Sequence, residues 1–335
     1  MMELKKPYLL FLGDAADQLA AKVAQGIKTW HPEYCVGQFR LPSCNADCGL
    51  EDLSIAAAAT AGAKTLVIGV ANRGGIISDE WVSVLIEALE SGLDIAAGLH
   101  NKLSDIPELV ACAEKHGRQL FDVRYPSQAY PVASGKKRAG KRLLTVGTDC
   151  SVGKMYTSLA IEKEAQKQGF NADFRATGQT GILICGEGVS ADCVVADFIA
   201  GAIETIAPAN SADHWDIIEG QGSLFHPSFA GVTTGLIHGS QADALVLCHE
   251  PTRTHMRGVP DYSLPDIETC MQANLATASL TNKNVQFVGI SVNTSQLEEK
   301  EALDYMAQLE SNIGLPVVDP FRQGVGRIVE KLAEL

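Results

Sequence analysis

Residues 143–154 read Leu-Leu-Thr-Val-Gly-Thr-Asp-Cys-Ser-Val-Gly-Lys, an apolar stretch followed by a loop that ends in Gly-Lys. A predicted strand that enters such a loop just before a helical pattern is typical of a phosphate-binding loop. Backbone N–H groups surround the phosphoryl oxygens, and the helix dipole and the lysine ammonium add positive charge. We expect the phosphates of a cofactor to be bound by Gly147, Thr148, Asp149, Cys150, Ser151, Val152, Gly153 and Lys154.

Two details of this loop bear on its chemistry. Five residues separate Gly147 from Gly153, a spacing also found in the P-loops of dethiobiotin-synthetase-like proteins. Met155 follows the lysine, where nucleoside triphosphatases place a Ser or Thr whose hydroxyl binds Mg²⁺. The loop is therefore expected to hold phosphate well and metal poorly, and we assign no metal ligands.

The composition is that of an ordinary globular protein. The 335 residues suggest two domains, because one domain takes roughly 150 residues. No segment approaches the about 20 apolar residues of a membrane span, and Met1 to Pro7 is too short and polar for a secretory signal. The nine cysteines lie mostly in apolar runs and favour a reducing compartment. We expect a cytoplasmic protein that does not bind membranes.

The charge is acidic and unevenly divided. Residues 1–140 contain 14 Lys/Arg and 16 Asp/Glu, whereas residues 141–335 contain 13 and 24. Between Arg175 and Arg253 there is no lysine or arginine. An acidic chain without a basic stripe is a poor candidate for binding nucleic acid. The few arginines at the edges of that gap are candidates for holding an anionic substrate.

The first half alternates apolar runs with helical segments, the pattern of a parallel α/β sheet. We expect a Rossmann-like domain over residues 1–125, although Gly13 alone is no dinucleotide fingerprint. The expected strands are 8–13, 65–70, 94–97 and 119–123, and the expected helices 15–28, 53–61, 79–91 and 106–116.

Residues 126–141 contain prolines, glycines and a basic cluster at Lys136, Lys137 and Arg138, and we interpret them as a linker whose charges face solvent or touch a polyanion. A P-loop domain with a mainly parallel sheet is expected over residues 142–335. Its expected strands after the loop are 215–218, 244–248 and 285–292, and its expected helices are 153–168, 265–281 and 296–312.

Three residues are candidates for acid–base chemistry. Glu219 ends a predicted strand, where P-loop folds place an acidic residue that organises a metal or a nucleophile, or it only caps a neighbouring helix. His249 follows the end of a predicted strand and is suited to proton transfer near neutral pH, although a surface histidine would give the same pattern. His226 lies in the polar loop after Glu219 and is a second-rank candidate base. Cys150 lies near a helix N-terminus, which lowers a thiol pKa and would favour an acyl intermediate, or it is there for its small size.

Substrate-binding candidates are arginines, because a guanidinium pairs bidentately with a carboxylate. Arg253 and Arg257 follow the strand that ends near His249. Asn72 and Arg73 lie in a glycine-rich loop after the strongest strand of the first half, which is either a binding loop or a turn into the next helix.

Four motifs together resemble the D-glutamate N-acetyltransferase family, two-domain P-loop proteins long catalogued as a domain of unknown function. They are residues 147–155, 175–181 (Arg-Ala-Thr-Gly-Gln-Thr-Gly), 219–224 (Glu-Gly-Gln-Gly-Ser-Leu) and 249–253 (His-Glu-Pro-Thr-Arg), and the resemblance covers nearly the whole chain. It implies transfer of an acetyl group from acetyl-CoA to D-glutamate, with N-acetyl-D-glutamate passed to a partner racemase. We also expect a homo-oligomer.

The chemistry of the loop agrees with this resemblance. A cradle without the metal-binding hydroxyl suits a diphosphate that is held but not cleaved, as in coenzyme A. The alternative is an ATP- and Mg²⁺-dependent ligase or kinase of the dethiobiotin-synthetase type that acts on a small carboxylate, in which Glu219 would hold Mg²⁺.

Overall fold

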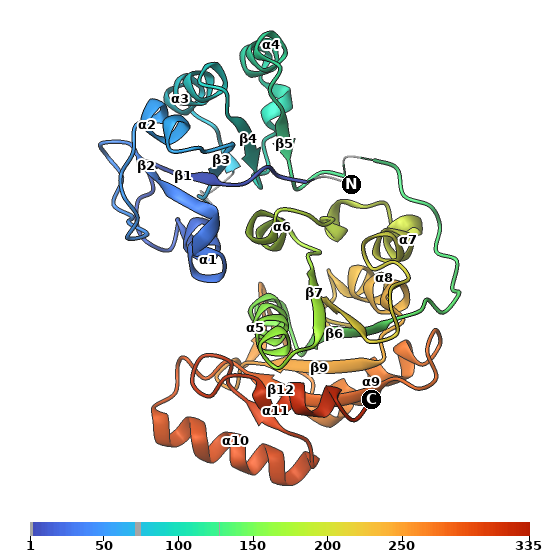
Figure 1. Cartoon of the computed structure of the whole chain (residues 1–335). Helices are drawn as coiled ribbons and strands as arrows, with labels where there is room; N and C mark the ends of the chain where they lie inside the picture. Colours follow the sequence, from blue (N-terminus) through green and yellow to red (C-terminus); the bar gives the residue numbers. More distant parts are fainter. Residues whose placement is uncertain (1–2, 71–74, 127) are drawn as a thin grey trace. The chain divides into compact units, whose positions relative to one another are not determined.

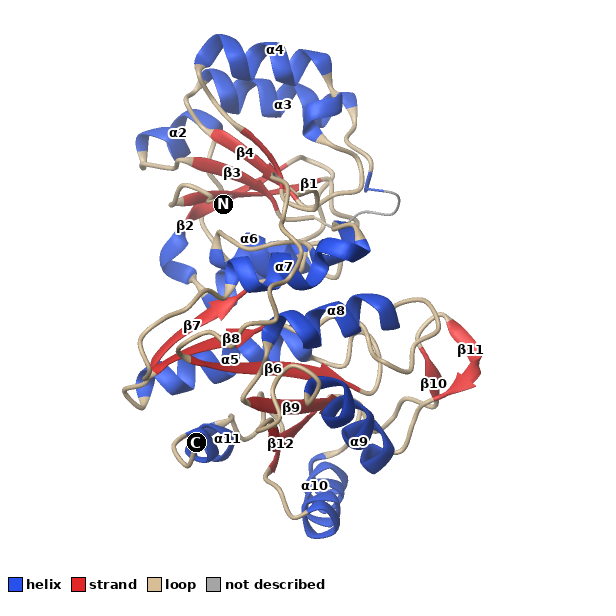
Figure 2. Ribbon diagram, turned by 90° about the vertical axis from the view of Figure 1, so that its right-hand side faces the viewer, coloured by secondary structure: helices blue, strands red, loops and turns tan. Residues whose placement is uncertain are grey.

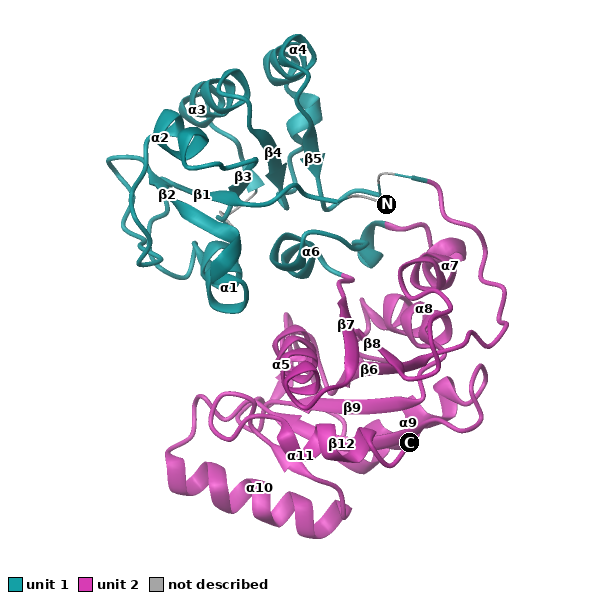
Figure 3. Ribbon diagram, viewed as in Figure 1, with its two compact units in different colours: residues 1–128, 178–193 teal, residues 129–177, 194–335 magenta. Residues whose placement is uncertain are grey.

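The computed structural model describes residues 3–70, 75–126 and 128–335. The chain divides into two compact units, each with one parallel sheet and helices packed against it (Figures 1 and 2). The first unit comprises residues 1–128 and 178–193, and the second comprises 129–177 and 194–335 (Figure 3). The expected α/β fold class is confirmed.

The sheet of the first unit has five parallel strands in the order β2-β1-β3-β4-β5. The strands β1, β3 and β4 are buried along their whole length, as strands covered on both faces should be. This 2-1-3-4-5 order is one of the common strand orders of doubly wound α/β sheets, the broader class that includes Rossmann-like domains. The bounds are β1 Tyr8–Gly13, β2 Cys35–Arg40, β3 Thr65–Ile68, β4 Asp94–Ala97 and β5 Leu120–Asp122.

The helices of the first unit begin and end at recognisable signals. The side chains of Ser54 and Ser78 accept hydrogen bonds from the first turns of α2 and α3, and Gly117 ends α4 in the left-handed conformation. The bounds are α1 Lys22–Trp30, α2 Ile55–Thr60, α3 Asp79–Glu90 and α4 Pro107–His116, with 3₁₀ turns at Pro32–Tyr34, Leu103–Asp105 and Ala191–Cys193.

One helix of the first unit comes from the second half of the sequence. Helix α6, Gln179–Cys185, packs against α1, and a Cβ at Gly26 would lie 3.2 Å from the side chain of Ile184. A Cβ at Gly98, just after β4, would likewise lie 3.2 Å from the side chains of Gln179 and Leu183. The expected unbroken second domain, 142–335, therefore differs from the observed division, because residues 178–193 cross back to cover the sheet face beside α1 (Figure 3).

The sheet of the second unit has six parallel strands in the order β13-β12-β9-β6-β8-β7. Its central strand β6 leads into the phosphate loop, with β8 and β9 on either side. The bounds are β6 Lys141–Gly147, β7 Asn171–Arg175, β8 His214–Ile218, β9 Ala244–His249, β12 Gln286–Val292 and β13 Val317–Val318, and a separate antiparallel ribbon pairs β10 His255–Met256 with β11 Val259–Ser263.

Helices cover both faces of this second sheet. Helices α5 and α11 contact each other and share a core with β6, β8, β9 and β12, whereas α8 packs against β6, α7 and α9. Within the part of the chain that the structure describes, no helix combines the length and apolar character needed to cross a membrane. The bounds are α5 Lys154–Lys167, α7 Ala196–Ile206, α8 Ala230–Ser240, α9 Ile267–Ala278, α10 Glu299–Ile313 and α11 Gly326–Leu332.

The basic side chains of the linker do not all face solvent or await a polyanion, contrary to the expectation from the sequence. Arg138 is 11% exposed; its Nη2 donates a hydrogen bond to the carbonyl of Gly239 over 2.8 Å, and its Nη1 lies 3.5 Å from a carboxylate oxygen of Glu204. Burial lowers the pKa of Arg138 to about 10. This segment is thus held against α7 and α8 by its own basic side chain.

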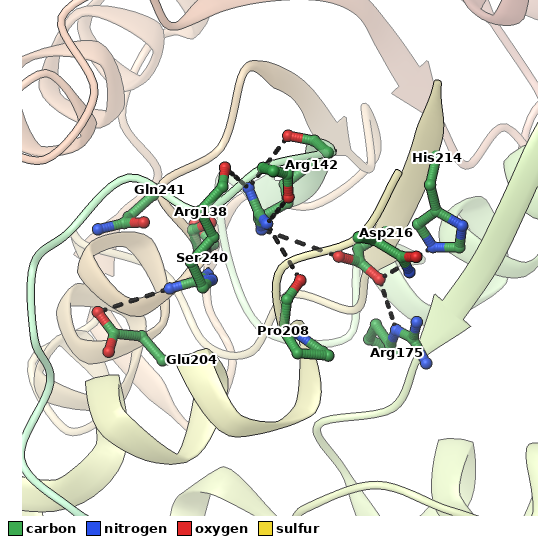
Figure 4. Close-up of polar contacts among 12 residues, drawn as sticks. Arg138, Arg142, Arg175, Glu204, Pro208, His214, Asp216, Ser240 and Gln241 are labelled. Atoms are coloured by element: carbon green, nitrogen blue, oxygen red, sulfur yellow. Dashed lines mark hydrogen bonds and ion pairs between the residues drawn. The ribbon is translucent and has the colours of Figure 1, made fainter. Parts of the chain in front are cut away.

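A buried charge pair joins the strands at the end of the sheet opposite the phosphate loop. Arg142 and Asp216, near the starts of β6 and β8, are both fully buried, with Nε and Oδ2 3.8 Å apart (Figure 4). Arg175 donates from Nε to the other oxygen of Asp216 over 2.7 Å. Removing one member would leave a buried charge without its partner and should destabilise the fold.

Candidate functional site

The loop after β6 has the backbone of a phosphate cradle. Gly153 has φ +101°, a left-handed conformation that favours glycine, and it is the residue before helix α5. A Cβ at Gly147 would lie 2.9 Å from Val152 Cγ2 and 3.1 Å from Lys154 Nζ, so glycine is needed for close packing. The structure therefore explains why residues 147 and 153 of the loop are glycine.

Lys154 lies beneath the loop. Its side chain is buried, and its Nζ donates a hydrogen bond to the carbonyl of Asp149 over 2.8 Å. Burial lowers the pKa of this ammonium, while the neighbouring Cys248, Cys150, Asp149 and Glu219 act in the opposite direction. The cation is thus enclosed by the loop that it is expected to serve.

Two arginines bind the loop. Arg253 donates from Nη1 to the buried carboxylate of Asp149 over 2.8 Å and to the carbonyl of Cys150 over 2.6 Å. It also pairs with Glu250. The backbone N–H of Arg257 donates to the same Asp149 oxygen over 2.8 Å. Arg253, a predicted substrate ligand, therefore holds the loop in shape.

The guanidinium of Arg257 is the more accessible of the two. Arg257 is exposed, and its Nη1 donates to the hydroxyl of Ser151 in the loop. The other predicted substrate residues, Asn72 and Arg73, lie outside the residues that the structure describes.

Glu219 follows β8 and lies beside the loop lysine. Its carboxylate accepts hydrogen bonds from the N–H of Thr177 over 2.8 Å and from Nε2 of Gln221 over 3.2 Å. Gly220 has no room for a side chain, since a Cβ there would lie 1.7 Å from the carbonyl oxygen of Thr145 and 3.1 Å from Cδ of Lys154. The carboxylate is buried and oriented next to the phosphate cradle.

Both ring nitrogens of His226 are engaged. The N–H of Ser228 donates to Nδ1 over 3.1 Å, and Nε2 lies 3.0 Å from the carbonyl of Arg257. Because Nδ1 accepts, Nε2 must carry the proton and donate to that carbonyl. His226 thus ties the loop after β8 to the segment that carries Arg257, and it would have to break a hydrogen bond to act as a base.

His249 contacts the phosphate loop at the end of β9. Its Nδ1 lies 3.0 Å from the hydroxyl of Thr148, and its ring stacks on Tyr305 with centroids 6.3 Å apart. Burial, reinforced by the positive charge of Arg253, lowers the pKa of His249 to about 4. The imidazole is neutral at pH 7, which makes it a hydrogen-bonding group and a weak base.

This depressed pKa predicts an acid-sensitive fold. An imidazole in the unfolded chain titrates near 6.5, so between about pH 4 and 6.5 the unfolded state binds a proton that the folded state does not. The free energy of unfolding should then fall as the pH falls through this window, by at most about 1.4 kcal/mol per pH unit from this residue. The free energy of unfolding, measured by urea denaturation at several pH values in this window, should depend less steeply on pH for His249→Asn than for the wild type. An equal pH dependence of the two proteins would contradict the burial of this imidazole.

Burial of Cys150 disfavours the thiolate form of its side chain. The sequence suggested a thiol pKa lowered by the helix N-terminus, but burial raises the pKa of Cys150 and outweighs Lys154, Arg257 and Arg253, which lower it. The thiol is half-buried and protonated at neutral pH. The expected lowering of this thiol pKa is therefore wrong, and the interpretation of Cys150 as a small loop residue stays a prediction.

A metal fits poorly at the loop. Asp149, Cys150 and His226 have potential ligand atoms within 4.8 Å of one another. However, one Asp149 oxygen accepts from the N–H of Cys150 and the other binds the two arginines, and both nitrogens of His226 are engaged. A cation would have to displace these partners and approach two guanidinium groups.

The residues that position the site were not assigned roles from the sequence. Thr177 holds Glu219 with two hydrogen bonds. Its backbone N–H donates to the Glu219 carboxylate, and its hydroxyl donates to the Glu219 carbonyl over 2.7 Å. The hydroxyl of Ser223 donates to the carbonyl of Thr148 over 3.2 Å. Both residues lie in the motifs 175–181 and 219–224, so the sequence indicates their segments. It does not indicate the backbone groups with which they form hydrogen bonds.

The fold and this site define a two-domain protein of the P-loop class, with the loop at the carboxyl ends of β6, β8 and β9. The chain belongs to the DUF1611 family. Residues 131–329 match the family's domain of unknown function described as the DUF1611_C P-loop domain, and residues 39–126 match the DUF1611_N Rossmann-like domain.

Relatives of nearly the same length are known. The chain is 60% identical over 330 residues to a protein of Tritonibacter scottomollicae named D-glutamate N-acetyltransferase, covering 98% of this chain and 99% of that protein. It is 54% identical over 331 residues to a protein of the same name from Pseudoalteromonas sp., covering 99% and 100%. A crystal structure of a DUF1611 family protein from Anabaena variabilis has a TM-score of 0.84 and 32% identity, covering 99% of this chain and 100% of that one.

Proposed function

We propose that this protein is a D-glutamate N-acetyltransferase that uses acetyl-CoA as the acyl donor. The observation that carries the proposal is the 60% and 54% identity, over almost the entire chain, to two proteins with that name. An N-acetyltransferase is an acyltransferase and requires an activated acyl group, which acetyl-CoA supplies. The product, N-acetyl-D-glutamate, would then be the substrate of a partner racemase, as the family resemblance implies.

The phosphate loop is the proposed site for the coenzyme A phosphates. Lys154 would turn its ammonium from the carbonyl of Asp149 to a phosphate oxygen, and loop N–H groups would add hydrogen bonds. Met155 offers no hydroxyl to a magnesium ion, which suits a diphosphate that is bound without being cleaved. The salt bridge between Asp149 and Arg253 would keep the cradle in shape before the donor binds.

Glu219 is the proposed general base. The amine of D-glutamate attacks the thioester carbonyl carbon, a C–N bond forms, the C–S bond breaks and coenzyme A leaves as its thiol. The nitrogen loses a proton in this process, and Glu219 is the group beside the cradle that can take it. His226 has no free ring nitrogen, and the lowered pKa of His249 makes it a weaker alternative.

Arg257 is the preferred ligand for the carboxylates of the acceptor. It is exposed and contacts the loop through Ser151, whereas Arg253 already pairs with Asp149 and Glu250. A planar guanidinium can hold a carboxylate with two parallel hydrogen bonds. We retain Asn72 and Arg73 as further candidates from the sequence.

A steady-state assay of thiol release tests this function. The purified protein should release coenzyme A from acetyl-CoA when D-glutamate is present, and much more slowly with L-glutamate or D-aspartate at equal concentration. Mass spectrometry should find N-acetylglutamate in an amount equal to the thiol released. Absence of acetylated product with every acceptor would refute the proposal.

Removal of divalent metal should leave turnover unchanged. The reason is that Met155 provides no metal ligand and the polar atoms of Asp149 and His226 are already engaged. The measurement is thiol release after dialysis against EDTA, with circular dichroism confirming that the protein remains folded. Loss of turnover that Mg²⁺ restores would instead support the ATP-dependent ligase or kinase.

A further inference from the structure

A group of potential metal ligands lies in the first unit, on helices α3 and α4. These helices pack side by side on one face of the sheet (Figures 1 and 2). Each precedes one of the parallel neighbouring strands β4 and β5, so their C-terminal ends lie at the same edge of the sheet. This is the edge where β4 and β5 begin, opposite the carboxyl ends where open α/β sheets usually bind ligands.

Three side chains of different chemistry meet at these helix ends. Glu90 is the last residue of α3, and Cys112 and His116 lie four residues apart on α4. Residues with this spacing project from the same helix face. One ligand atom from each of the three lies within 4.8 Å of the other two. In a zinc site each ligand atom lies about 2.0–2.3 Å from the ion. Small side-chain rotations would bring the three ligand atoms close enough together to share one ion.

The surroundings of the group favour a cation. Two helix C-termini point their negative dipole ends toward this edge, and the carboxylate of Glu90 adds a formal charge. Nε2 of His116 is buried and has no hydrogen-bond partner among the described residues. A buried ring nitrogen without a partner is costly unless something binds it. The Sγ of Cys112 donates a weak hydrogen bond to the carbonyl of Ile86 over 3.9 Å.

We propose that Glu90, Cys112 and His116 form an accessory site for a zinc-class divalent cation that links the C-terminal ends of α3 and α4. Thiolate and imidazole ligands select such an ion over Mg²⁺ or Ca²⁺, which prefer oxygen. Glu90 is exposed, so water completes the coordination. The site lies within the first unit and is independent of the proposed acetyl transfer.

Cobalt(II) titration of the full-length, metal-free protein tests this site. Co²⁺ replaces Zn²⁺ in such sites, and a bound thiolate gives a charge-transfer absorption that water and carboxylate ligands do not give. The wild type should show this band at one equivalent of Co²⁺, and Zn²⁺ should abolish it. Cys112→Ser should lose the band, and His116→Ala should require at least tenfold more Co²⁺ to reach it.

Matched variants separate this site from other cysteines. Cys44→Ser removes a thiol of the same unit outside the cluster, and Cys150→Ser removes the thiol of the phosphate loop; both should keep the band. Glu90→Gln, at an exposed position that does not endanger folding, should weaken binding. A wild type without the band, or a band that survives Cys112→Ser, would overturn the proposal.

Discussion

Replacing Glu219 by Gln should lower kcat by roughly 10²–10⁴-fold while leaving acetyl-CoA binding nearly unchanged. Glutamine keeps the size of the side chain and one acceptor for the N–H of Thr177, but it cannot take a proton from the attacking amine. The effect should shrink as the pH rises, because an amine that has already lost its proton depends less on a base. Steady-state kinetics over a range of pH would measure both effects.

A control variant makes this result specific. Glu268→Gln, at an exposed position on α9, removes the same charge from the second unit and should leave kcat unchanged. A Glu219→Gln protein that is folded and has near-normal kcat would remove Glu219 as the base. A deficit independent of pH would give the carboxylate a positioning role only.

Replacing Lys154 by Ala should weaken acetyl-CoA binding roughly 10- to 100-fold. Loss of one charge-assisted hydrogen bond to a phosphate costs roughly 1.5–3 kcal/mol. Residues 147–154 contain no second lysine that could replace Lys154. The affinity for D-glutamate should change little, because its proposed ligand is Arg257. Isothermal titration with acetyl-CoA gives the affinity directly.

Helix α5 also carries the control for this variant. Lys163 lies on the same helix but is exposed, and Lys163→Ala should bind acetyl-CoA like the wild type. Normal affinity in a folded Lys154→Ala protein would show that the coenzyme A phosphates bind elsewhere.

Apolar periodicity was sufficient to predict most of the fold. Strands β1 and β4 have the predicted bounds, because buried parallel strands are continuous apolar runs. The edge strand β2 was not predicted, since Gln38 and Arg40 interrupt its pattern and are satisfied by Asp52. The helix predicted over 15–28 begins only at Lys22, because the Asp17 side chain binds the N–H of Ala20 and favours a turn.

The division into units could not be predicted in the same way. Residues 182–184, Ile-Leu-Ile, show that α6 is buried, but nothing in their pattern indicates which sheet they cover. Their partners include Gly26 and Gly98, more than 80 residues earlier in the chain. Only tertiary contacts reveal that this helix belongs with the first unit.

The candidate site was predictable in position and less so in detail. The phosphate loop, Glu219 and His249 gather at one sheet edge because β6, β8 and β9 are parallel neighbours. The engagement of His226 and Arg253 depends on backbone carbonyls, those of Arg257 and Cys150, which carry no sequence signal. Burial of Cys150, which reverses the expected pKa shift, is likewise a property of the folded chain.

Competitive titration calorimetry tests the central claim most directly, namely that the phosphate loop serves an acyl-CoA donor and not Mg-ATP. The wild type should bind acetyl-CoA in EDTA, Lys154→Ala should bind it more weakly, and prior addition of Mg-ATP should not block acetyl-CoA binding at comparable concentrations. Tight Mg-ATP binding that depends on Lys154, with no binding of acetyl-CoA, would contradict the account.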